Sequence, residues 1–305
     1  MFNKFQGCLI GLAIGDALGA PVQFRSRDTF KISSYQKGGD YNVDIGEYTD
    51  DTAMALCLAE SLIKDGFSTK SQLDIYIKWY EYGYLGTRDY PFDIGITVSM
   101  SLDHYKQTKN EFSPFIHEEY SGNGSIMRLV PVIMYFINDL ENAVYYAGIS
   151  STTTHSSPIA IDACRLLAFY LFYIFHGYKK DLLFSKYFFE KIDNFFKESP
   201  LHPKIENIAK GFFIKKQRPQ INSTGYVVHT LQAALWSFYS TDSFEESLIK
   251  AANLGDDADT VGAVTGQLAG AYYGLDSINK KYILPLYNKE LILEYAKKLY
   301  FKNFS

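Results

Sequence analysis

The sequence predicts a predominantly helical protein, and three observations support this prediction. Almost no segment alternates apolar and polar residues with the period of two that a half-buried strand requires. Apolar residues instead recur at helical spacing through most of the 305-residue chain. Glycines four residues apart, which is a helical period, occur near both ends of the chain, at positions 7–19 and 262–274. We therefore expect helices from one end of the chain to the other.

The composition is typical of a soluble globular protein with a substantial core. Hydrophobic residues make up 47% of the chain and charged residues 21%, and the net charge of −4 argues against a nucleic-acid-binding protein. Tyr and Phe are numerous, and we expect them to fill the core. The three cysteines lie among apolar residues without a CxxC pair, which favours a reducing, cytoplasmic location. No apolar run reaches membrane-spanning length, so we expect no membrane segment. We also expect the protein to be a monomer.

The glycines at the two ends of the chain predict the centre of the fold. A glycine inside a helix costs about 1 kcal/mol relative to alanine, so a row of them needs a compensating contact. We expect the two glycine-faced helices to pack against each other, which brings the chain ends together in a single domain over residues 1–305. Pro21 should end the first helix, with Gln23 in an extended link. The glycines concerned are Gly7, Gly11, Gly15 and Gly19, and Gly262, Gly266, Gly270 and Gly274.

The segment YTDDTAMALCLAESLIKDG, residues 48–66, predicts a helix that begins at an acidic cluster and ends at Gly66. Thr49, Asp50 and Asp51 lie at its N-terminus. The helix dipole favours a carboxylate there by about 0.3–1 kcal/mol, so capping alone could account for one acid. It does not account for two adjacent acids flanked by threonines. These oxygen ligands suggest a hard-cation site.

A matching acidic segment, NLGDDADT, precedes the closing glycines and contains Asp256, Asp257, Asp259 and Thr260. Residues two apart on a regular helix diverge by about 200°. We therefore expect the helix to begin near Thr260 with Asp259 close to its N-cap, so that Asp257 and Asp259 can converge. A second hard-cation cluster is one interpretation. An N-cap with additional solvated acids is the other.

The periodicity between these clusters predicts further helices. Pro158 at the first turn and Gly177 past the end mark a clear helix between them. Ser199-Pro200 and His202-Pro203 interrupt an aromatic, lysine-rich region that carries no motif. Other helical segments fall at residues 68–86, 226–239, 244–252 and 286–301.

Three loops carry further candidate site residues. Asp93 lies between Pro91 and Gly95, where it either serves a site or caps the next helix. The stretch SGNGSIMR, residues 121–128, could form a nest of backbone N–H groups that binds an anion, although glycine-rich turns are common. His155 directly precedes the helix that starts at Pro158, and isolated histidines are most often structural.

Taken together, these segments resemble the ADP-ribosylglycohydrolase family. GLAIGDALGAPVQF, YTDDTAMALCLAESL, FDIG, GNGSIMR, TTTH and LGDDADTVGA occur in the order found in that family, and only residues 178–222 lie outside the resemblance. The resemblance implies an all-α, single-domain orthogonal helical bundle with a dinuclear metal cleft. Two Mg²⁺ are the implied cofactors, with Mn²⁺ as the alternative.

The resemblance also implies roles for individual residues. The implied metal ligands are Thr49, Asp50, Asp51, Asp257, Asp259 and Thr260. The implied substrate-binding residues are Gln23, Asp93, Gly95, Gly122, Asn123, Gly124, Ser125, Met127 and His155. Asp51 is our first choice for the carboxylate that orients or deprotonates the attacking water, with Asp50 and Asp93 as the other catalytic candidates.

The implied activity is metal-dependent hydrolysis of the glycosidic bond between ADP-ribose and its acceptor. Partners would be ADP-ribose or an ADP-ribosylated protein, and a nucleic acid only when it carries ADP-ribose. The chain departs from many members of the family at Gln23, where they carry a glutamate, and an amide cannot take a proton. This favours, as an alternative, a non-catalytic ADP-ribose-binding or immunity-type protein. A nucleotide phosphohydrolase is a third option, which the lack of His-Asp pairs disfavours.

Overall fold

Helices are the regular elements of residues 1–304, the part of the chain that the computed structural model describes, and no strand occurs there. The prediction of an all-α protein is therefore confirmed. The α-helices are α1 (Phe2–Gly19), α2 (Asp50–Asp65), α3 (Thr69–Tyr82), α4 (Ile96–Thr108), α5 (Val130–Tyr135), α6 (Leu140–Thr152), α7 (Pro158–Phe175), α8 (Lys180–Leu183), α9 (Lys186–Phe195), α10 (Pro203–Ala209), α11 (Val227–Tyr239), α12 (Phe244–Ala252), α13 (Ala258–Tyr273), α14 (Lys280–Ile283) and α15 (Lys289–Phe304).

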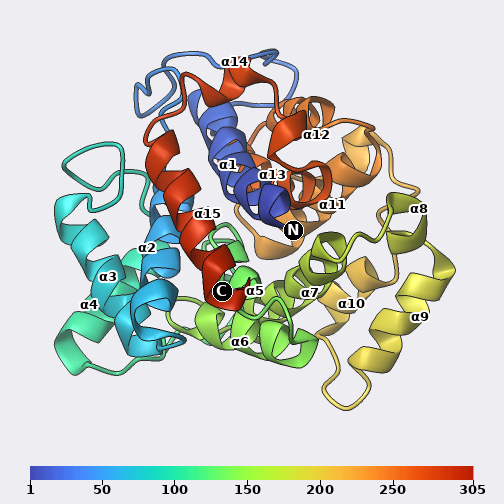
Figure 1. The fold of residues 1–305 in the computed structure, drawn as a ribbon, viewed down its shortest axis with the longest axis horizontal. Coiled ribbons are helices and arrows are strands. Elements are labelled where there is room, and N and C mark those ends of the chain that lie inside the picture. Colours follow the sequence, from blue (N-terminus) through green and yellow to red (C-terminus); the bar gives the residue numbers. More distant parts are fainter. Residues whose placement is uncertain (305) are drawn as a thin grey trace.

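Helices α1 and α13 pack side by side and antiparallel through their glycines (Figure 1). A Cβ atom built on Gly15 would overlap the carbonyl oxygen of Gly262, and one built on Gly262 would overlap that of Gly15. The pairs Gly11–Gly266 and Gly7–Gly270 repeat this contact along the helices. The two backbones thus touch where any side chain would hold them apart, and the predicted pairing of the chain ends is confirmed.

This antiparallel pairing sets the location of the acidic segments. It places the C-terminal end of α1 beside the N-terminal end of α13, where a Cβ on Gly19 would meet the backbone of Asp259. Gln23 follows α1 after a 3₁₀ turn, Ala20–Val22, and its backbone is extended as predicted. The helix α1 ends at Gly19, and Pro21 lies inside the turn that follows it.

The N-terminus of α13 differs from the prediction. The helix begins at Ala258 with Asp257 as its N-cap, so Asp259 lies within the first helical turn and not in a loop. The prediction of a start near Thr260 was wrong by two residues. The reason is that Gly255 and Asp256 take positive φ angles of 74° and 54° and so make the turn earlier in the chain.

The remaining helices surround the α1–α13 pair in two flanks (Figure 1). Helices α2 to α4 lie on one side, and the segment α8 to α10 lies on the other, against α7. Phe188 of α9 packs on Phe169 and Tyr170 of α7, with ring centroids 5.7 and 5.4 Å apart. Many of the aromatic residues thus lie in the core, as the composition predicted.

Two helices are long and apolar enough to cross a membrane by length and composition alone. They are the stretch Phe2–Val22 and helix α7, and 94% and 78% of their apolar windows are buried inside the protein. The expectation that no segment reaches this length was therefore too strict. Both helices supply the core of the bundle.

Candidate active site

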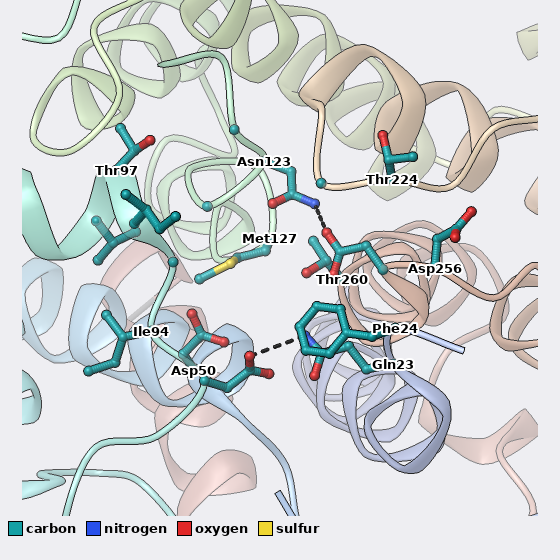
Figure 2. Close-up of a pocket in the computed structure, with 18 of the residues that line it drawn as sticks. Gln23, Phe24, Asp50, Ile94, Thr97, Asn123, Met127, Thr224, Asp256 and Thr260 are labelled. Atoms are coloured by element: carbon teal, nitrogen blue, oxygen red, sulfur yellow. Dashed lines mark hydrogen bonds between the residues drawn. The ribbon is translucent and has the colours of Figure 1, made fainter. Parts of the chain in front are cut away.

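A cavity of about 650 Å³ opens where the C-terminal end of α1, the N-termini of α2 and α13 and three loops meet (Figure 2). Most of the predicted site residues line it, although they come from positions up to 237 residues apart in the chain. Those lining residues are Gln23, Asp50, Asp93, Gly95, Gly122, Asn123, Gly124, Met127, His155, Asp257 and Thr260.

Four predicted site residues do not line the cavity. Asp51 and Asp259 are 0% and 1% exposed and lie beneath its floor. Thr49 is the N-cap of α2 and bonds to Asp16 behind the cavity. Ser125 is buried below the glycine loop, where its hydroxyl accepts hydrogen bonds from Ser151 and Cys164. This geometry therefore argues against a direct contact between the Ser125 hydroxyl and a ligand in the cavity.

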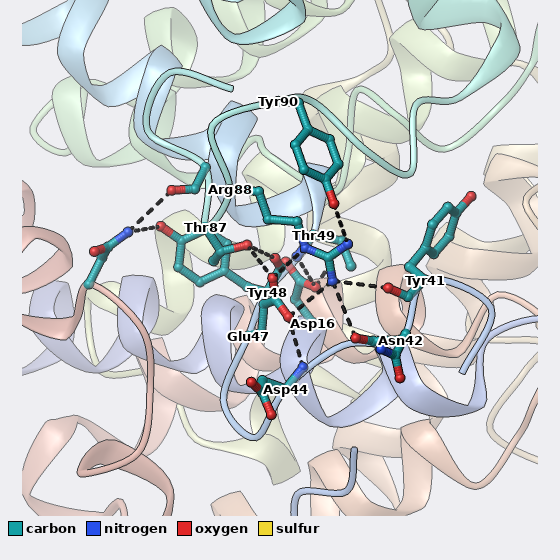
Figure 3. A network of polar contacts seen from close by, with 12 residues as sticks. Asp16, Tyr41, Asn42, Asp44, Glu47, Tyr48, Thr49, Thr87, Arg88 and Tyr90 are labelled. Atoms are coloured by element: carbon teal, nitrogen blue, oxygen red, sulfur yellow. Dashed lines mark hydrogen bonds and ion pairs between the residues drawn. The ribbon is translucent and has the colours of Figure 1, made fainter. Parts of the chain in front are cut away.

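Asp16 of α1 holds the N-terminus of α2 in place (Figure 3). Its Oδ1 accepts hydrogen bonds from the backbone N–H and the hydroxyl of Thr49, both at 2.9 Å. Its Oδ2 accepts from the N–H and the hydroxyl of Thr52, at 3.0 and 2.6 Å. This fully buried carboxylate therefore caps a neighbouring helix and fixes the direction in which Asp50 and Asp51 leave it.

The acids of α2 and α13 approach each other across 209 residues of sequence. The Thr260 hydroxyl lies 3.3 Å from Asp51 Oδ1, to which it donates a hydrogen bond. Asp257 Oδ2 accepts a bond of 2.6 Å from the Asn123 side-chain amide, which ties the glycine loop to the acids (Figure 2). The predicted convergence of the two acidic segments is therefore present in the fold.

Asp93 enters the same cluster from the loop before α4. The Gln23 side-chain Nε2 donates a hydrogen bond of 3.1 Å to Asp93 Oδ1. The alternative interpretation of Asp93 as a helix cap is wrong, since Gly95 is the N-cap of α4 and no side chain caps that helix. Asp93 itself has a positive φ of 57°, a conformation that few non-glycine residues adopt and that often occurs at functional sites.

Arg88 anchors the loop that carries Asp93 (Figure 3). Its guanidinium bonds both carboxylate oxygens of the buried Glu47, at 2.7 and 3.1 Å, and the backbone carbonyl of Tyr41 at 3.0 Å. It also lies 4.2 Å from the centre of the Phe92 ring. This bidentate pair therefore fixes the residues on both sides of the cavity rim next to Asp93.

The acids raise one another's pKa. Burial is the main cause for Asp50, Asp51 and Asp259, and neighbouring carboxylates add to it, so that the pKa of each lies well above its ordinary value. Burial also raises the pKa of Asp93 and Asp257, and it raises the pKa of Asp16 to about 7 despite four hydrogen bonds. The charged form of these carboxyl groups is thus disfavoured in the protein alone, because no Lys or Arg of the described residues lines the cavity to balance it.

The donor set fits a hard cation. Several buried oxygens of the cluster have no hydrogen-bond partner: Asp51 Oδ2, Asp93 Oδ2, Asp259 Oδ1 and Gln23 Oε1. No Lys or Arg of the described residues lines the cavity, whereas Asp50, Asp93, Asp256 and Asp257 do. Carboxylate, amide and hydroxyl oxygens are the ligands that Mg²⁺ and Mn²⁺ prefer. Within residues 1–304, however, no three acidic, His or Cys side chains already stand in a finished chelating geometry.

The glycine loop packs against His155. A Cβ atom on Gly124 would lie 2.8 Å from the imidazole, and one on Gly122 would lie 3.1 Å from it. Burial lowers the pKa of His155 to about 3, so the ring is neutral at pH 7. The N–H groups of Gly122 and Gly124 form no backbone hydrogen bond within the described residues and remain available to an anion.

Arg128 supports this loop from below. The guanidinium is 1% exposed and donates to the Gly124 carbonyl at 3.0 Å and to the Thr154 hydroxyl at 2.7 Å. Thr154 in turn lies 2.9 Å from His155 Nδ1. A buried cation therefore fixes both the glycine loop and the imidazole that touches it.

Sequence reasoning missed Asp16, Arg88 and Arg128. Asp16 is the one acidic residue of a largely apolar helix, and a buried carboxylate needs partners, so this signal was available. Arg128 closes the predicted glycine segment but no pattern marked it as buried. The partners of Arg88 lie about 40 residues away, and no spacing in the sequence indicates them.

The all-helical fold, with a cavity lined by four aspartates and a glycine-rich loop, is that of a helical hydrolase. Comparison with known proteins specifies the family. The chain belongs to the ADP-ribosylglycohydrolase family, whose model matches residues 1–303. It is an ADP-ribosylglycohydrolase, an enzyme that hydrolyses the bond between ADP-ribose and its acceptor.

Three relatives illustrate the match. The chain is 36% identical to ADP-ribosylarginine hydrolase Tri1 of Serratia proteamaculans, over 98% of this chain and 79% of that protein. It is 29% identical to ADP-ribosyl-[dinitrogen reductase] glycohydrolase of Rhodospirillum rubrum, over 90% and 87%. A solved structure described as an ADP-ribosylglycohydrolase-related protein complex superimposes with a TM-score of 0.86 at 35% identity, over 99% and 98% of the two chains.

Proposed function

We propose that the protein releases ADP-ribose from ADP-ribosylated arginine side chains, with two Mg²⁺ bound by the acids of α2 and α13, or two Mn²⁺ in their place. Two relatives that match 98% of this chain, at 36% and 33% identity, are named ADP-ribosylarginine hydrolases. Their names support arginine as the acceptor. The chain would act as a monomer on modified proteins in the cytoplasm, and its three unpaired, buried cysteines are compatible with that compartment.

The observation that carries the proposal is the charge of the cavity. The substrate carries a negatively charged diphosphate, whereas the cavity is lined by four aspartates and, within the described residues, by no Lys or Arg. The neutral His155 adds no positive charge. Divalent cations between the carboxylates and the substrate would resolve this repulsion, and the positive charge of a modified arginine would be favoured in the same field.

The proposed cation ligands are Thr49, Asp50, Asp51, Asp257, Asp259 and Thr260. Asp16 accepts a hydrogen bond from the Thr49 hydroxyl, which leaves the oxygen lone pairs of that threonine free for a cation. When bound, Mg²⁺ supplies charge neutralisation and lowers the pKa of a water molecule.

The residues of the chain would share the remaining tasks. Hydrolysis at the anomeric carbon passes through an oxocarbenium-like state that needs a fixed sugar and an oriented water. The glycine loop and Asn123 would bind the diphosphate and the ribose. Asp93 lines the cavity, is held by Gln23 and keeps one oxygen unpaired, so we assign it the water or the proton in preference to the deeper Asp51.

A turnover assay on a protein ADP-ribosylated at arginine tests this function. Release of ADP-ribose with Mg²⁺ or Mn²⁺, and its loss in EDTA, is the expected result. The non-catalytic alternative rests on Gln23, which cannot act as the base that a glutamate provides. Tight ADP-ribose binding by calorimetry without any release under either metal would support that alternative and contradict the proposal.

A further inference from the structure

Two exposed side chains at the mouth of the cavity, Phe24 and Asp256, make few contacts that would stabilise the fold. Phe24 and Asp256 both line the cavity, and both are exposed, Phe24 by 59% (Figure 2). Within the described residues the Phe24 ring has no aromatic or cationic partner. Asp256 forms no ion pair there, and its side chain accepts a single hydrogen bond, from Ser223 at 3.3 Å.

The backbone at both residues is left-handed. Phe24 has a φ of 62° and Asp256 a φ of 54°, a conformation in which glycine is preferred and a phenylalanine is uncommon. The two segments hold each other, since the Phe24 N–H donates to the Asp256 carbonyl at 2.7 Å and the Asp256 N–H donates to the Arg25 carbonyl at 3.0 Å. Side chains kept at strained positions on a cavity rim suggest a use in binding.

The positions of these two residues relate them to the bond that breaks. Phe24 directly follows Gln23, and Asp256 directly precedes Asp257, so each stands one residue outward from the acidic floor. Figure 2 shows Phe24 and Asp256 on the α13 side of the cavity, with Ile94 across from them. An acceptor joined to a ribose bound at the floor would pass Phe24 and Asp256 where it left the cavity on this side.

The chemistry of the pair fits one kind of acceptor. An exposed aromatic face attracts a planar cation, and a carboxylate accepts hydrogen bonds from the N–H groups of such a cation. A substituted guanidinium is planar, positively charged and rich in N–H groups, so it fits both side chains. Serine and other neutral acceptors fit neither. Arg27 lies nearby, but its guanidinium is engaged with the backbone carbonyls of Leu254, Arg218 and Ile221. The charges of Arg27 and Asp256 attract each other, but Arg27 donates no hydrogen bond to Asp256, whose carboxylate can still accept N–H groups of a substrate.

We propose that Phe24 and Asp256 form an acceptor subsite that binds the guanidinium of ADP-ribosylated arginine and gives the enzyme its preference for that acceptor. The inference rests on the proposed function, because it concerns the acceptor in that same cavity. Phe24 supplies the stacking face and Asp256 the charge, and neither residue takes part in bond cleavage.

The test compares matched peptides that carry ADP-ribose on arginine or on serine. Asp256→Asn removes the charge at constant shape, and Asp256→Gly and Phe24→Gly place glycine where the backbone favours it. We expect each variant to raise KM for the arginine-linked peptide about tenfold, with a smaller change for the serine-linked peptide, because a charged contact is lost only for arginine. Asp256→Gly should melt no lower than the unmodified protein. Asp276→Asn, an exposed aspartate in a turn away from the cavity, is the matched charge control.

A second readout does not depend on turnover. Agmatine, a guanidinium on a short chain, is titrated into the protein saturated with ADP-ribose, and we expect weak binding that Asp256→Asn abolishes. If agmatine binds equally to both proteins, or if the arginine-to-serine ratio of kcat/KM is the same in all variants, the subsite is wrong even though hydrolysis stands. If agmatine binding is lost in Asp256→Asn but no arginine-linked peptide is cleaved, the subsite stands and the proposed function fails.

Discussion

The Gln23 amide nitrogen lies 3.1 Å from Asp93 Oδ1 and donates a hydrogen bond to it, so that an amide occupies a place where a glutamate would face another carboxylate. The bond joins the segment after α1 to the loop before α4, and Gln23 Oε1 and Asp93 Oδ2 are both buried without a partner. Gln23 thus lowers the repulsion within the acidic cluster and orients Asp93 at the same time.

Gln23→Glu tests this role. We expect the variant to melt several degrees lower than the unmodified protein in EDTA, because the new carboxylate loses the hydrogen bond and adds negative charge beside Asp93. Mg²⁺ should then raise its melting temperature by more than it raises that of the unmodified protein. Gln36→Glu, at an exposed position, is the matched control. Equal responses of all three proteins to Mg²⁺ would contradict this role for Gln23.

Asp16→Asn should weaken the cation site from a distance. The NH₂ group of the asparagine cannot accept hydrogen bonds, so the N–H and hydroxyl donors of either Thr49 or Thr52 lose their acceptor. We expect these unsatisfied donors to lower the free energy of unfolding by about 2–3 kcal/mol. With the start of α2 less fixed, we expect Mn²⁺ affinity to fall at least about tenfold. Urea unfolding and calorimetry measure the two effects. Unchanged Mn²⁺ affinity in a folded variant would show that Asp16 serves stability alone.

Gly15→Ala should disrupt the pairing of α1 with α13. The added methyl group overlaps the Gly262 carbonyl, so the two helices have to separate and the acids they carry move with them. Gly148→Ala in α6 is the matched control, because the nearest atoms to its methyl group belong to the side chains of Arg165 and Ile161, at 3.2 and 3.3 Å, and not to a backbone. We expect chemical denaturation to show a loss of several kcal/mol for the first variant and little change for the second. Similar stabilities would argue against close helix contact.

His155 should make the protein less stable in mild acid. Its folded-state pKa of about 3 lies below the ordinary value of 6.5, so its stabilising contribution is present above pH 6.5 and is lost as the pH falls below it. The slope is about 1.4 kcal/mol per pH unit, or about 2 kcal/mol between pH 6.5 and 5. His155→Gln should lack this part of the pH dependence of urea unfolding. Parallel pH profiles for the two proteins would mean that His155 is not buried in its neutral form.

The sequence predicted those features of the structure that depend on a local pattern of residues. The four-residue spacing of Gly7 to Gly19 predicted a helix contact, and the close approach of the two backbones bears it out. Helix α12 begins and ends at the predicted residues, Phe244 and Ala252. The resemblance to a family indicated most of the residues that line the cavity, because its motifs name them one by one.

The remainder depended on contacts between distant residues. Asp51 and Asp50 are neighbours in the sequence, and only the packing of α2 on α13 decides that one faces the cavity while the other lies beneath it. Asp16 received no role from the sequence because its partners are 33 and 36 residues away. Ser125 follows the glycine loop in sequence, yet its hydroxyl turns toward Ser151 in the core.

The central claim is that acids from α2 and α13 jointly bind the divalent cations on which ADP-ribose release depends. Titration of the metal-free protein with Mn²⁺, followed by calorimetry and by turnover of an arginine-ADP-ribosylated protein, tests it most directly. We expect two Mn²⁺ per chain, and we expect Asp257→Ala to lose both high-affinity binding and release. Full turnover by Asp257→Ala in EDTA, or no Mn²⁺ binding by an active unmodified protein, would contradict the claim.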